Sequence, residues 1–126
     1  RSAAAAACVA DHAPDAFLAF NSSLYDHQPS ESTRGLTNDE LASLAREAGA
    51  TDPAVTPCIT RQDFAGWVAD ATNRAMNDPV PNSSLDGITS TPTIIVDGEQ
   101  YNADGAASLA DVDAFAAFVR EHGRAS

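Results

Sequence analysis

Residues 89–101 constrain the fold of this chain more than any other segment. Their sequence, Thr-Ser-Thr-Pro-Thr-Ile-Ile-Val-Asp-Gly-Glu-Gln-Tyr, predicts a loop that contains Pro92, a short apolar strand, an Asp-Gly turn and a return strand. A lone two-stranded hairpin is marginally stable in water, so the apolar strand residues Ile94 and Val96 need further partners. We therefore expect that further strands, or another copy of the chain, complete the sheet.

Helical patterns dominate the rest of the sequence. Thr37 and Glu40 form a capping box at the start of one predicted helix, and Gly49 ends it. Ser108 and Asp111 form a similar cap before the last helix. A connector with two prolines precedes the helix that begins at Cys58. The predicted helices span residues 1–12, 14–27, 37–48, 58–77 and 112–123.

The composition predicts a small core rich in alanine. A chain of 126 residues forms one domain or part of one. Because alanine buries little apolar area, the helices should pack closely and a few large side chains should supply most of the burial. The side chains expected in this role are Phe17, Phe20, Phe64, Trp67, Phe115 and Phe118.

The charge of the chain excludes some classes of partner. The formal net charge is −11, and such a surface repels nucleic acid and anionic lipid. No apolar run is long enough to span a bilayer. The alanine run between Arg1 and Cys8 is too short for a signal peptide and favours a helix start. Because the chain opens without methionine and within a helical pattern, we expect a processed or truncated product.

Segment 87–93, Gly-Ile-Thr-Ser-Thr-Pro-Thr, is similar to the Gly-Val-x-Gly-Thr-Pro-Thr segment of DsbA-like thiol–disulfide oxidoreductases. Ser90 stands where that family usually has glycine. The whole chain resembles the later two thirds of this family, in particular its actinobacterial extracytoplasmic type. Further segments that carry the resemblance are residues 1–10, 17–20, 24–25, 28–29 and 35–37, with Phe64 and Trp67.

The resemblance implies an α/β, thioredoxin-like fold with a helical insertion. Residues 1–87 would form the four-helix insertion, and residues 88–126 the proline loop, β-hairpin and last helix. The Cys-x-x-Cys pair that performs redox chemistry in this family is absent from the sequence. The family has that segment immediately before the point where this chain starts, so we expect a truncated form whose thioredoxin-like domain is incomplete.

The same resemblance assigns substrate binding to Ser90, Thr91 and Pro92. Local sequence alone favours a trans proline at the start of an edge strand, since only about 5–6% of X-Pro bonds are cis. The resemblance instead implies a cis Thr91–Pro92 bond, with the backbone of Thr91 presented to an extended peptide. It implies no catalytic residue within these 126 residues, no metal and no cofactor.

The two cysteines, Cys8 and Cys58, leave three alternatives open. They could form a structural disulfide, remain as two buried thiols, or bind a metal together with His12. A disulfide would close a loop of about fifty residues and stabilise the chain by roughly 4 kcal/mol. The resemblance favours the disulfide, because actinobacterial members carry a second, non-catalytic disulfide at comparable positions.

The function implied by the resemblance is disulfide formation or exchange in secreted proteins. The chain would be part of an extracytoplasmic oxidoreductase, secreted or membrane-anchored in the cell envelope, and inactive alone. Its partners would be extended, cysteine-containing protein substrates, and a dimer or swapped assembly could complete the sheet. The alternative is a non-catalytic thioredoxin-like domain that binds peptides and completes its sheet with a partner chain.

Overall fold

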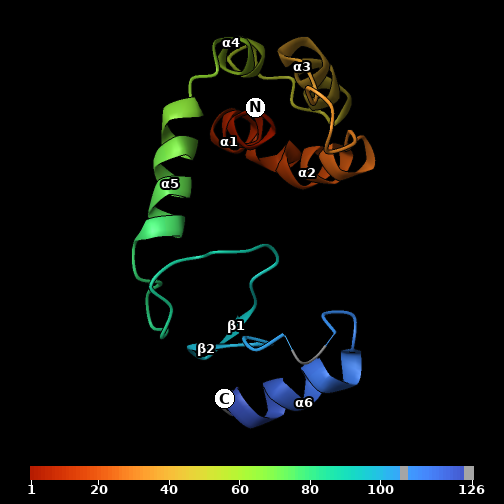
Figure 1. Ribbon diagram of the computed structural model, residues 1–126. Helices are drawn as coiled ribbons and strands as arrows, with labels where there is room; N and C mark the ends of the chain where they lie inside the picture. Colours follow the sequence, from red (N-terminus) through yellow and green to blue (C-terminus); the bar gives the residue numbers. More distant parts are fainter. Residues whose placement is uncertain (106–107, 124–126) are drawn as a thin grey trace. The chain divides into compact units, whose positions relative to one another are not determined.

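The computed structural model describes residues 1–105 and 108–123, which form two compact units, residues 1–70 and residues 71–126 (Figure 1). The first unit contains α1 (Ser2–His12), a short 3-10 helix (Pro14–Ala16), α2 (Phe17–Asp26), α3 (Asn38–Glu47) and α4 (Val55–Arg61). Helix α5 (Ala65–Asn77) begins in the first unit and ends in the second. The second unit then contains β1 (Ile95–Val96), β2 (Glu99–Gln100) and α6 (Val112–His122).

The predicted division into residues 1–87 and 88–126 follows family architecture and stays a prediction. Within its second part, residues 106–107 and 124–126 lie outside the described residues. Helices and a small sheet occur together, as an α/β fold requires. None of the helices in the described ranges 1–105 and 108–123 has the length and apolar character needed to cross a membrane.

The core of the first unit forms around α1, which contacts α2, α3 and α4 (Figure 1). Because the buried faces of these helices are rich in alanine, the helices approach closely and few large side chains are needed. Phe20 is fully buried, as predicted. The other large, fully buried side chains are aliphatic residues of α1, α3 and α4, namely Val9, Leu41, Val55 and Ile59.

Trp67 is the clear exception to the predicted core. Its side chain is 59% exposed, whereas the pattern predicted burial. Apolar residues do recur at helical spacing around Trp67, but α5 has no buried residue along its whole length. An apolar stripe predicts the face that a helix can bury, and here no other element of the first unit covers that face at Trp67.

The predicted helix over residues 58–77 is wrong in its continuity. Helix α4 ends at Arg61, and Gln62 adopts a left-handed conformation with φ of 56°. The Gln62 N–H donates to the carbonyls of Cys58 and Ile59, which closes the helix. Helix α5 then starts at Ala65. Pro57 was predicted to lie in a connector but lies in the first turn of α4, where its missing N–H leaves no helical bond unmade.

The capping box at the start of α3 is confirmed. The Thr37 N–H donates to a carboxylate oxygen of Glu40 at 2.7 Å, and the Glu40 N–H donates to the Thr37 hydroxyl oxygen at 3.3 Å. The backbone and hydroxyl donors of Thr37 stabilise the ionised carboxylate and hold the pKa of Glu40 below its ordinary value.

This lowered pKa predicts a pH dependence of stability. The capping carboxylate contributes stability above the ordinary glutamate pKa and loses it as the pH falls through the lower folded-state pKa. The difference in unfolding free energy between wild type and Glu40→Gln should therefore shrink on acidification, in urea titrations between pH 6 and pH 3. An unchanged difference across that range would contradict the assignment.

The hairpin of the second unit has the predicted turn between its two strands. Ile95 pairs with Gln100 and Val96 with Glu99, and the turn residues between them adopt φ of 53° and 98°. Positive φ at both positions is what a type I′ hairpin turn requires, so the Asp-Gly turn is confirmed. In the described part of the chain, the sheet consists of these two strands.

Helix α6 packs beside the hairpin through aromatic contacts. Tyr101, which follows β2, is 5% exposed, and its ring centre lies 5.2 Å from those of Phe115 and Phe118. Both phenylalanines are half-buried rather than fully buried. The predicted cap of Ser108 and Asp111 is confirmed only for Asp111, whose carboxylate accepts the Ala114 N–H at 3.0 Å as the N-cap. The Ser108 hydroxyl instead accepts the Ala110 N–H before the helix begins.

Candidate functional site: an exposed proline loop

The proline loop, residues 90–93, lies between the end of α5 and the hairpin of the second unit. Its entry is fixed by the Ile88 N–H, which donates to the Ala75 carbonyl of α5 at 2.7 Å. Its exit leads into β1, and the Tyr101 N–H donates to the Ile94 carbonyl at 2.9 Å, just beyond the two paired positions. Both ends of the loop are therefore held by backbone hydrogen bonds.

Ser90, Thr91 and Pro92, the predicted substrate-binding residues, are all exposed. The Thr91–Pro92 peptide bond is cis. The Thr93 hydroxyl donates to the Ser90 carbonyl at 2.6 Å. Among the residues that the structure describes, the N–H and C=O of Thr91 form no hydrogen bond. An exposed backbone donor and acceptor on one residue can pair with an extended peptide.

Gly87 has a role at the entry to this loop that sequence reasoning missed. A Cβ atom at this position would lie 2.4 Å from the carbonyl oxygen of Met76 and 2.9 Å from its carbonyl carbon. Only a residue without a side chain lets the two backbones pass this closely. Gly87 was noted as part of the segment that resembles DsbA-like proteins, but nothing in the sequence shows that Met76 is its neighbour.

A polar hollow of about 360 Å³ lies beside the loop. Thr93 and Gln100 contribute to its wall from the loop and from β2. The other lining residues come from the end of α5 and the segment before the loop, namely Met76, Asn77, Leu85, Asp86, Gly87 and Thr89.

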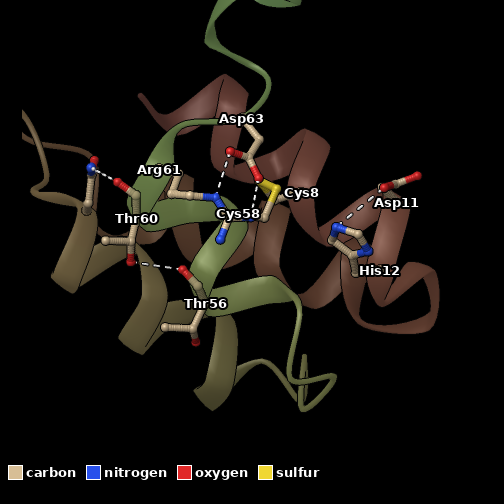
Figure 2. Close-up of a disulfide and its surroundings, with 9 residues drawn as sticks. Cys8, Asp11, His12, Thr56, Cys58, Thr60, Arg61 and Asp63 are labelled. Atoms are coloured by element: carbon tan, nitrogen blue, oxygen red, sulfur yellow. Dashed lines mark hydrogen bonds and ion pairs between the residues drawn. A yellow bond between two sulfur atoms is a disulfide. The ribbon is translucent and has the colours of Figure 1, made fainter.

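The predicted disulfide between Cys8 and Cys58 is confirmed. The two residues are fifty positions apart in sequence, and their Cα atoms are 5.8 Å apart, so the bond joins α1 to α4 (Figure 2). Cys8 is fully buried and Cys58 is 1% exposed. Because the bond occupies both sulfurs, the two-thiol and metal-site alternatives are wrong. His12, the third residue of the metal-site alternative, instead lies beside Asp11, with 3.4 Å between its Nε2 and the Asp11 carboxylate oxygen.

An ion pair lies next to the disulfide, as Figure 2 shows. The Arg61 guanidinium donates to both carboxylate oxygens of Asp63, at 2.7 and 3.1 Å. These hydrogen bonds lower the pKa of Asp63 and raise that of Arg61, while His12 lowers the pKa of Asp63 more weakly by its charge. Both side chains face solvent, so the pair contributes little to stability.

The first unit also has an uncharged groove of about 580 Å³. The alanines of α1 that lie outside the core line this groove, together with the aromatic side chains of Phe17, Tyr25 and Trp67. The remaining lining residues are Ser2, Ala3, Ala6, Ala7, Ala10, Asn21, Leu24, Gln28, Pro29 and Leu36. Sequence reasoning missed this groove because the alanines of α1 lie on two faces, and only one of these faces is in the core.

The family follows from comparison with known proteins. Residues 1–116 match the family model described as thioredoxin. The chain belongs to the thioredoxin family. No curated protein and no solved structure matches the chain significantly. Membership of this family suggests a redox or disulfide role.

Proposed function

We propose that this chain is the substrate-holding part of an extracytoplasmic, DsbA-like thiol–disulfide oxidoreductase. Ser90, Thr91 and Pro92 would hold an extended, cysteine-containing segment of a protein substrate. The observation that carries the proposal is that Thr91 is an exposed residue whose backbone N–H and C=O form no hydrogen bond within the described residues. The thioredoxin family match to residues 1–116 supplies the redox context.

The chemistry requires a thiolate that this chain does not supply. In disulfide exchange, a thiolate attacks one sulfur of a disulfide, forms a mixed disulfide and releases the other sulfur as a thiolate. The only cysteines here, Cys8 and Cys58, are bonded to each other and buried. In this proposal the reactive cysteines lie outside the 126 residues, and the loop aligns the substrate for their attack.

The disulfide supports an extracytoplasmic location in this proposal. Disulfides persist in oxidising compartments and are rare where glutathione and thioredoxin keep thiols reduced. In the proposed architecture, residues 1–87 form the helical insertion and the Cys8–Cys58 bond holds that insertion together. A β-strand from outside these residues, or from a second copy of the chain, would complete the two-stranded sheet.

A second candidate function is peptide binding without redox chemistry. The observation that favours it is that both cysteines of the chain are bonded to each other in one buried disulfide. The two candidates predict the same peptide contacts at Thr91, and they differ in whether bound substrate disulfides are exchanged. The coding sequence that precedes Arg1 separates them, because the oxidoreductase requires a Cys-x-x-Cys segment there and the peptide-binding domain does not.

The loop should bind an extended peptide. We expect a ten-residue peptide with one S-methylated cysteine to shift the amide NMR signals of Ser90 and Thr91, with Kd of about 1 mM, since few hydrogen bonds form. The control is the same peptide with N-methyl groups on the residues flanking the cysteine, which removes the donors. No change at residues 88–96 at saturating peptide would overturn the proposal.

A further inference from the structure

We propose that Thr93 is a positioning residue that holds the backbone around Thr91 in the conformation that pairs with a peptide. This inference rests on the proposed peptide-binding function of the loop. Its origin is the hydrogen bond from the Thr93 hydroxyl to the Ser90 carbonyl, at 2.6 Å. Thr93 is half-buried, whereas the three residues before it are exposed.

The hydroxyl has two consequences for the backbone of the loop. First, it occupies the Ser90 carbonyl, which would otherwise be an exposed acceptor next to the binding position. Second, it joins the two ends of a four-residue turn through a side chain, because no described backbone hydrogen bond joins Ser90 to Thr93. The hydroxyl thereby limits the conformations of the turn that carries the N–H and C=O of Thr91, the groups proposed to pair with a peptide.

Loss of the hydroxyl should weaken binding without unfolding the hairpin. In Thr93→Val the side chain keeps its shape, while the Ser90 carbonyl becomes solvated and the turn samples more conformations. A pre-organised loop loses less entropy on binding than a mobile one. One neutral hydrogen bond of this kind corresponds to a change in peptide Kd of about fivefold to tenfold.

The test compares three variants of the whole chain with the S-methylated peptide as probe. Thr93→Val should bind about fivefold to tenfold more weakly, and Thr93→Ser, which keeps the hydroxyl, should bind within about twofold of wild type. Thr33→Val is the matched control. The Thr33 hydroxyl donates to the Ser30 carbonyl at 2.8 Å, the same kind of bond three residues back, but it lies in the first unit and outside the proposed site, so its removal should leave binding unchanged.

Several outcomes would overturn the inference. Equal binding by wild type and Thr93→Val would do so while leaving the proposed function intact, whereas no binding by wild type would remove both. If Thr93→Val and Thr93→Ser both bind the peptide more weakly than wild type by the same factor, the effect comes from packing and not from the hydroxyl. The Ser90 carbonyl carbon signal gives a readout without peptide. It should move toward the value of a solvated carbonyl in Thr93→Val and stay in place in Thr93→Ser.

Discussion

Replacing Cys8 and Cys58 together with alanine should lower the free energy of unfolding of the first unit by about 4 kcal/mol. The bond joins residues fifty positions apart, so it removes a large part of the conformational freedom of the unfolded chain. The free energy of unfolding of a whole domain is only about 5–15 kcal/mol, so a loss of this size is a large part of it. With an alanine-rich core that buries little area, we expect the double variant to be close to unfolding at 37 °C.

Urea unfolding followed by far-UV circular dichroism measures this effect. The reduced wild-type chain is the matched control, because it lacks the bond but keeps both sulfur atoms in the core. Reduced wild type and the double variant should lose similar amounts of stability if the crosslink dominates. A double variant within about 1 kcal/mol of the oxidised wild type would show that the bond adds little to this fold.

The second large effect is expected from Gly87→Ala. The new methyl group would meet the Met76 carbonyl oxygen at 2.4 Å, so the segment must move away from the end of α5. That movement would also break the adjacent bond between the Ile88 N–H and the Ala75 carbonyl. We expect the second unit to lose about 1–3 kcal/mol and the loop to lose its peptide binding, since this segment sets the position of Thr91.

Gly66→Ala is the control for that substitution. Gly66 lies in the first turn of α5, and a Cβ there has no heavy atom within 4 Å. Because alanine favours helix over glycine, this variant should be neutral or more stable by up to about 1 kcal/mol, with peptide binding unchanged. The amide spectrum and the peptide titration test both variants, and full binding by Gly87→Ala would contradict the role given to that contact.

The features that sequence analysis found are those whose signal is local. The capping box of Thr37 and Glu40 and the Asp-Gly turn each depend on residues within four positions of one another. The disulfide was one of three alternatives from the residues alone, and family resemblance favoured it. In each case, nearby residues or a known architecture restrict the structure without any knowledge of distant contacts.

The features that were missed depend on contacts between distant segments. The break after α4 occurs at Gln62, a residue with no special preference for the left-handed conformation, so no turn signal marked it. The exposure of Trp67 depends on which element covers α5, and periodicity does not contain that information. Likewise, Gly87 and Met76 approach each other because of how the chain is folded, and their spacing in sequence does not reveal it.

The exposed position of Trp67 also determines how this protein can be observed. It is the single tryptophan of the chain, and its indole is already largely in contact with water in the folded state. Its emission maximum should therefore change little when the first unit melts. Its intensity should instead respond to molecules that enter the groove it lines, so the fluorescence of this chain is suited to report ligand occupancy rather than unfolding.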